Sequence, residues 1–134
     1  MGDVVRTNVG GIARIASVMS NVGPGDALTP IRILTGVGGV IKATPGMLFK
    51  ITAYNVNAAV RYLHIYNKAT APTLSTDTPL MTFALNPTSA REIDMAGMGV
   101  TFSTGIAWAF TTDDIAIPAT AGTSTELHAT VLYS

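Results

Sequence analysis

The sequence feature that most constrains this fold is a series of short apolar segments whose side chains alternate between two faces. In residues 61–67, for example, Leu63 and Ile65 point to one side of an extended chain. The residues between them carry polar tips and point to the other side: Tyr62, His64 and Tyr66. A period of two residues is typical of β-strands, and the segments are bounded by Gly, Pro, Asn and Asp, which favour turns. The pattern therefore predicts an all-β protein.

About eight such segments follow one another along the chain. The remaining ones lie at 31–34, 40–42, 49–54, 80–85, 91–94, 106–110 and 127–133. This number and spacing are typical of a β-sandwich or a jelly-roll-like barrel, and we place that domain at residues 27–134. Within it, residues 69–79 carry a proline near each end and predict a long ordered loop.

The alternation also predicts which side chains form the core. In 49–54 it places Phe49, Ile51 and Ala53 on one face. In 106–110 the bulky residues share one face opposite two alanines, and they are Ile106, Trp108 and Phe110. Asparagines at 55–58 and glycines at 36–39 tolerate the conformations of tight turns, so both segments are expected to connect hairpins.

Residues 1–26 do not fit the strand pattern and are expected to form an N-terminal arm. Ile12, Ile15 and Met19 are spaced as on one face of a helix, but flanking glycines are equally compatible with an extended segment. A glycine-rich apolar arm cannot bury its own isoleucines. These three residues are therefore candidates for an interface with a neighbouring subunit.

Charged residues make up only 12% of the chain and cancel to a net charge of zero, against about 25% charged residues in ordinary domains. A surface with so little charge is poorly protected against association. The composition thus predicts a homo-oligomer or a component of a larger assembly. The absence of a basic excess argues against nucleic-acid binding.

The chain contains no cysteine, which excludes disulfides and thiolate chemistry. No stretch of about 18 apolar residues predicts a membrane span, and residues 1–8 carry Asp3 and Arg6, unlike a signal peptide. Synthesis and folding in the cytoplasm are therefore expected.

No group of residues has the pattern of a catalytic or metal site. His64 and His128 lack the further ligands that zinc requires, and the carboxylate pairs at 92–94 and 113–114 are typical of strand edges and turns. The glycine-rich segment 36–40 lacks the Lys-Ser or Lys-Thr of a phosphate-binding loop. We therefore expect a protein that is not an enzyme and uses no cofactor or metal.

The aromatic residues suggest a binding surface instead. Tyr62 and Tyr66 share one face of a strand, and tyrosine is enriched at protein interfaces. We take both as candidate interface residues, or as residues packed against a second sheet. A sugar-binding groove that includes Trp108 is the alternative, although Trp108 lies between alanines and is expected in the core.

Two segments resemble small virion structural proteins of tailed bacteriophages. One is residues 61–79, in which a strand ending in Tyr66-Asn67-Lys68 leads into an Ala-Pro-Thr loop and a Thr-Asp-Thr-Pro step. The other is residues 102–112, with a Gly-Ile-Ala step into an apolar strand. The resemblance covers residues 46–134.

This resemblance implies a β-sandwich subunit of a phage particle, made in the host cytoplasm and located in the virion. Its first implication is a capsid decoration, or cement, protein that binds the major capsid protein and acts as a homotrimer or other homo-oligomer. A tail, neck or fibre component of the same virion is the second. A carbohydrate-binding β-sandwich module is the alternative from another class.

Overall fold

A computed structural model of the chain describes residues 31–95 and 97–134. These residues form nine strands and no helix. The predicted arm at 1–26, with its helical or extended alternatives, lies outside the described residues. The strands are β2 (Ile31–Leu34), β3 (Gly38–Lys42), β4 (Gly46–Asn55), β5 (Arg61–Asn67), β6 (Met81–Leu85), β7 (Ser89–Asp94), β8 (Val100–Phe102), β9 (Ile106–Thr111) and β10 (Leu127–Tyr133).

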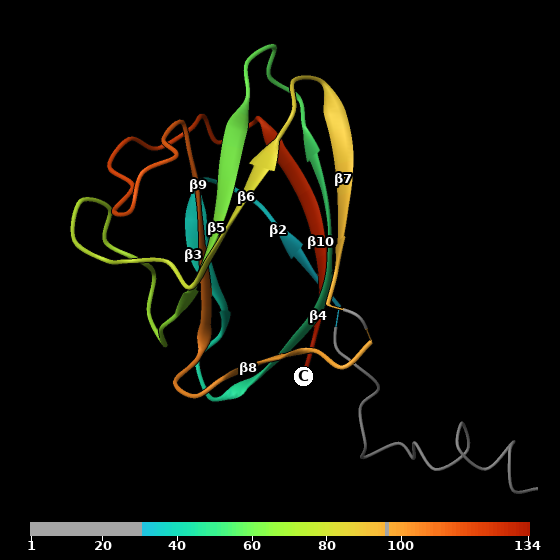
Figure 1. Cartoon of the computed structure of the whole chain (residues 1–134), viewed down its shortest axis with the longest axis vertical. Coiled ribbons are helices and arrows are strands. Elements are labelled where there is room, and N and C mark those ends of the chain that lie inside the picture. Colours follow the sequence, from blue (N-terminus) through green and yellow to red (C-terminus); the bar gives the residue numbers. More distant parts are fainter. Residues whose placement is uncertain (1–30, 96) are drawn as a thin grey trace, which may run out of the picture.

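The strands form two antiparallel sheets, as Figure 1 shows. One sheet has five strands in the order β2-β10-β4-β7, with β8 also paired to β4, and the other has the order β3-β9-β5-β6. Both sheets are open at their edges, so the barrel alternative is wrong for the described residues. The all-β prediction is confirmed.

One apolar core lies between the sheets and takes residues from every strand. Its members include Ile51 and Ala53 of β4 and Leu63 and Ile65 of β5, all fully buried. The bulky face of β9 also points into it, with Trp108 only 3% exposed. The alternation therefore predicted these core residues correctly.

Phe49 is the exception, because a β-bulge shifts the alternation at this point of β4. Leu132 of β10 pairs with Lys50, and the next residue, Tyr133, pairs with Leu48, so Phe49 has no partner in β10. A bulge inserts one extra residue and redirects the side chains that precede it. Leu48 is consequently fully buried and Phe49 is only half-buried. The prediction that Phe49 shares the face of Ile51 and Ala53 is wrong.

The two predicted hairpins are also wrong, since each connection crosses between sheets. Residues 35–37 lead from β2 in one sheet to β3 in the other, and residues 56–60 likewise lead from β4 to β5. The side chain of Asn55, fully buried, holds the second crossing. Its Nδ2 donates to the carbonyl oxygens of Ala59 at 2.9 Å and Leu85 at 3.0 Å, and its Oδ1 accepts from the Asn57 amide at 2.9 Å.

The lateral edges of the core are each closed by an arginine from the five-stranded sheet. Arg32 of β2 donates from Nη1 to the carbonyl oxygen of Ile41 in β3, at 3.0 Å. Arg91 of β7 donates from Nη1 to the carbonyl oxygen of Ala84 in β6, at 2.8 Å, and lies over the Phe83 ring. Long basic side chains can cover apolar residues while their charged heads reach polar partners. The two arginines thus link the sheets at opposite sides.

Candidate interface

The two sheets differ in what covers their outer surfaces. We call the face of the five-stranded sheet that points away from the core the outer face. Strand register places eleven residues on it: Ile31, Ile33, Lys50, Thr52, Tyr54, Ala90, Glu92, Asp94, His128, Thr130 and Leu132. None of these eleven is fully buried within the part of the chain that the structure describes.

The outer face is apolar at one end and charged at the other. On β2, Ile31 and Ile33 are each 69% exposed. They lie beside Leu132 and Thr130 of β10 in the register. Toward β7, Lys50 forms an ion pair with Glu92, and the hydrogen bond and charge of Glu92 raise the pKa of Lys50. An exposed pair of this kind adds little stability. The exposed isoleucines are the more informative feature, because large apolar side chains gathered on a sheet face are typical of binding surfaces.

The opposite surface, on the four-stranded sheet, is covered by two loops. Residues 68–80 and 112–126 lie beyond β5 and β9 (Figure 1), and the Ser75 amide donates to the Pro118 carbonyl oxygen at 2.8 Å to join them. Asp77 pairs with Lys68 and accepts from the Thr73 amide, and these contacts with Lys68 and Thr73 lower its pKa. The prediction of an ordered loop at 69–79 is confirmed. Both faces of β9 are consequently buried.

The loops change the interpretation of the predicted tyrosine surface. Tyr66 is only 2% exposed and packs with Ala107, Ala109 and Leu74 beneath the first loop. Burial, together with the nearby charge of Asp77, raises its pKa to about 12. Tyr62, at the other end of β5, is half-buried. Tyr66 is therefore not available as an interface residue in the described fold, and a loop rather than a second sheet covers it.

Ile12, Ile15 and Met19, the other predicted interface residues, lie outside the described residues. The exposed Ile31 and Ile33 were missed. Their alternation with Arg32 and Leu34 predicts a strand but leaves open which pair faces outward. No local signal identifies them, because a charged residue such as Arg32 ordinarily marks the side that faces solvent.

His64 is a buried, hydrogen-bonded histidine between β6 and β9. Its Nδ1 lies 2.8 Å from Thr82 Oγ1 and its Nε2 lies 2.6 Å from Thr111 Oγ1. Thr111 Oγ1 also lies 3.1 Å from the Asp113 carbonyl oxygen, a further acceptor for its hydroxyl. A neutral imidazole has one donor and one acceptor nitrogen, so the two threonine hydroxyls can satisfy both.

Burial lowers the pKa of His64 by more than the backbone of Asp113 and the charges of Asp114 and Asp113 raise it. In the unfolded chain His64 has the ordinary histidine pKa of 6.5. Near and below this pH it therefore binds more protons in the unfolded chain than in the folded chain. Neutral, buried His64 therefore contributes its full stabilisation above about pH 6.5, and this stabilisation is lost as the pH falls below that value.

We therefore expect the free energy of unfolding to decrease as the pH falls from about 7.5 to 5.5. His64→Gln should be less stable at pH 7.5 by roughly 1–3 kcal/mol and should show a flatter pH profile. Urea titrations across this range measure both effects, above the pH at which most carboxylates titrate. His128→Gln, at an exposed position on the outer face, is the control. A profile equally steep in His64→Gln would contradict the role of His64.

The carboxylate pairs at 92–94 and 113–114 lie on an edge strand and in a loop. Asp113 Oδ2 accepts from the amides of Ala119 at 2.9 Å and Thr120 at 2.6 Å, and these hydrogen bonds lower its pKa. Asp94 and Glu92 lie on the edge strand β7, as expected. These contacts match the turn and edge roles that the sequence predicted.

Glu126 joins three segments near one end of the sheets. Its carboxylate accepts from Arg61 Nε at 2.9 Å, from the Asn57 side chain and from the Thr123 amide. Burial acts to raise its pKa, but these hydrogen bonds together hold the pKa below its ordinary value. Among the described residues no three His, Cys, Asp or Glu side chains form a cluster suited to a metal ion.

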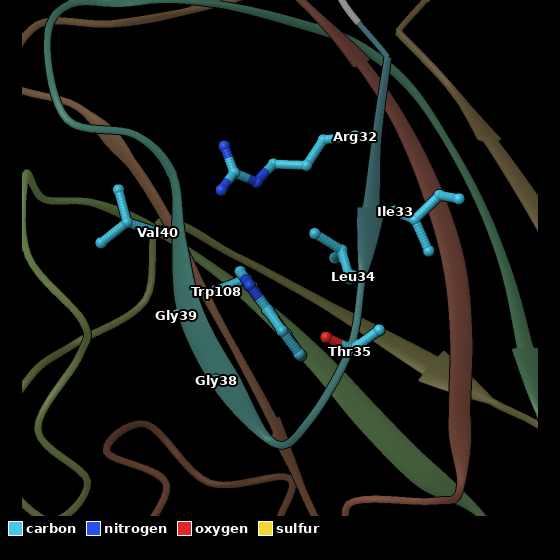
Figure 2. A pocket seen from close by; sticks show the side chains of 8 residues that line it. All are labelled: Arg32, Ile33, Leu34, Thr35, Gly38, Gly39, Val40 and Trp108. Atoms are coloured by element: carbon cyan, nitrogen blue, oxygen red, sulfur yellow. The ribbon is translucent and has the colours of Figure 1, made fainter.

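A pocket of about 230 Å³ opens between β2 and β3, where each strand is the last of its sheet (Figure 2). Eight residues line it: Arg32, Ile33, Leu34, Thr35, Gly38, Gly39, Val40 and Trp108. In Figure 2 the Arg32 side chain reaches from β2 toward β3, whereas the Ile33 side chain points away to the outer face. Because Trp108 is 3% exposed, it does not offer the broad ring surface on which sugars stack.

No protein-family model, curated protein or solved structure matches this chain. Within residues 31–95 and 97–134 there is also no helix of sufficient length and apolar character to cross a membrane.

Proposed function

We propose that the chain has the jelly-roll topology and serves as a structural subunit of a tailed-phage virion. The topology is supported by four nested antiparallel pairs: β5 with β6, β4 with β7, β3 with β9, and β2 with β10. Nested pairs describe one long hairpin. The pairs β4–β10 and β5–β9 then roll this hairpin into two sheets. Such double-sheet jelly rolls occur in viral capsid proteins, and also in lectins and cupins.

Within the virion we propose the role of a capsid decoration protein that binds the major capsid protein. The observation that carries this proposal is the outer face, with Ile31 and Ile33 each 69% exposed beside Leu132. Covering an isoleucine side chain contributes about 1.5–3 kcal/mol, and many symmetry-related copies multiply a modest contact. A role of this kind requires a stable fold and a complementary surface, but no catalytic group.

Two sequence properties support the same role. The chain is low in charged residues, at 12%, and has no net charge, so the outer face meets little repulsion from another copy or from a shell. Residues 61–79 and 102–112 resemble virion proteins, and in the fold they contribute the neighbouring strands β5 and β9 together with the first covering loop. Self-association as a trimer and an arm at residues 1–26 remain predictions.

Separated heads and tails of the phage that encodes this chain provide the test. Purified chain added to each fraction should co-sediment saturably with heads and not with tails, and mass spectrometry should detect the native protein in heads. Detection in tails alone would replace the decoration role with the tail alternative. Binding to neither fraction, with no copy in the virion, would overturn the proposal.

A further inference from the structure

The pocket between β2 and β3 is separate from the outer face, and its chemistry points to a ligand of its own. Of its eight lining residues only Arg32 carries a charge. One nitrogen of the guanidinium, Nη1, donates to the Ile41 carbonyl oxygen. An arginine side chain has five N–H donors arranged in a plane, so most of them remain for another acceptor.

A second donor comes from Trp108. Its side chain lines the pocket, and an indole N–H can only donate. Figure 2 shows the indole nitrogen at the end of the ring nearer the Arg32 guanidinium. The pocket thus combines a cationic donor and a neutral donor in one small space.

Glycine keeps this space open. A Cβ atom at Gly39 would lie 3.4 Å from Trp108 Nε1, so any side chain there would cover the indole N–H. The neighbouring Gly38 likewise adds only backbone to the wall. Because β2 and β3 each end their sheets on this side, no further strand closes the opening within the described residues.

We propose that this edge pocket binds a single carboxylate group. A carboxylate is planar, accepts two parallel hydrogen bonds from a guanidinium, and has lone pairs left for an indole N–H. The volume of about 230 Å³ is below the roughly 300–1,000 Å³ of pockets for drug-sized ligands. The occupant is therefore a small acid or one acidic side chain of a partner protein. This inference does not depend on the virion role.

Trp108 is the only tryptophan of the chain, so its fluorescence reports on this pocket alone. Propionate, titrated at constant ionic strength, should produce a saturable change in emission. Propionamide, its neutral analogue, should not. Arg32→Gln and Gly39→Ala should each weaken propionate binding by about 10- to 100-fold, the loss expected for a hydrogen bond to a charged group.

Arg91→Gln is the matched control, because Arg91 makes the corresponding contact between the sheets at the opposite edge. It should bind propionate like the original chain. Arg32→Lys, which keeps the charge and loses the planar fork, should be intermediate, and thermal unfolding of each variant checks that it is folded. Equal responses to propionate and propionamide, no saturable change, or unchanged binding by Arg32→Gln would overturn the proposal.

A second titration distinguishes the two sources of the carboxylate. N-acetyl-glutamate methylamide presents an acidic side chain within a peptide unit, and N-acetyl-glutamine methylamide is its neutral partner. Binding of the glutamate compound at least about tenfold tighter than propionate would support the site and assign it to a partner's side chain. Equal binding of the two acids would support the site and assign it to small free acids.

Discussion

Gly105→Ala is expected to lower the free energy of unfolding by about 3 kcal/mol or more, at the upper end of the cost of overpacking. A Cβ atom at this position would lie 2.8 Å from each of three backbone atoms: Ala69 Cα, Lys42 O and Lys68 O. Backbone atoms cannot rotate away as the end of a side chain can. The Gly105 carbonyl oxygen also accepts from the Lys68 amide at 3.1 Å, so any shift would strain the contact between the segments before β9 and after β5.

Gly39→Ala is the matched control for this substitution. The nearest atom to a Cβ at Gly39 is the indole nitrogen of Trp108, at 3.4 Å, and the strand position accepts alanine. We expect a change of less than about 1 kcal/mol there. Urea unfolding followed by circular dichroism measures both variants. Equal stability of Gly105→Ala and the original chain would contradict the close approach of these three segments.

The strands and most core residues could be predicted from the sequence because alternation is a local property. Ile51, Leu63 and Trp108 face the core as their positions predict. The bulge at Phe49 could not be predicted in this way. It arises where β4 changes partner, pairing with β7 from Lys50 onward and with β8 up to Leu48. That change depends on strands more than 40 residues later in the chain.

The two connections predicted as hairpins show the same limit. Asn55 and Gly36 identify turns, and turns are present at both positions, but turn residues do not determine whether the chain returns to the same sheet. At Asn55 the crossing to the other sheet depends on a distant contact, the hydrogen bond from the Asn55 side chain to the Leu85 carbonyl oxygen. Pairing between sheets is therefore a tertiary property that the local sequence leaves open.

The position of the exposed outer face could not be predicted from the sequence. Low charge indicates that some surface is meant to be covered, and strand alternation provides two faces for each sheet. Neither property predicts which face the loops cover. Tyr66 looked like a surface residue because its strand neighbours alternate, and the loop carrying Leu74 buries it. Ile31 and Ile33 remain exposed because neither covering loop lies on their sheet.

The second large effect is expected from the outer face. Replacing both exposed isoleucines, in an Ile31→Lys and Ile33→Lys double variant, should weaken binding to phage heads by about 100-fold or more. Losing two isoleucine side chains that the head would cover costs roughly 3–6 kcal/mol of binding free energy. Each new lysine charge would also be covered in the contact without a partner. Both side chains are 69% exposed, so the free energy of unfolding should change by no more than about 0.5 kcal/mol per site.

A matched control lies in the loops on the other side of the molecule. Ile115 and Ile117 are 56% and 42% exposed, and they belong to the loop that covers the four-stranded sheet. An Ile115→Lys and Ile117→Lys double variant adds the same two charges away from the outer face. It should bind heads like the original chain.

Co-sedimentation of the original chain and these two double variants with isolated heads tests most directly whether the outer face is the assembly surface. We predict saturable binding by the original chain and by the loop variant, and none at the same concentrations by the outer-face variant. Undiminished binding of heads by the outer-face variant would contradict the assignment of this face. Loss of head binding in the loop variant alone would contradict it too.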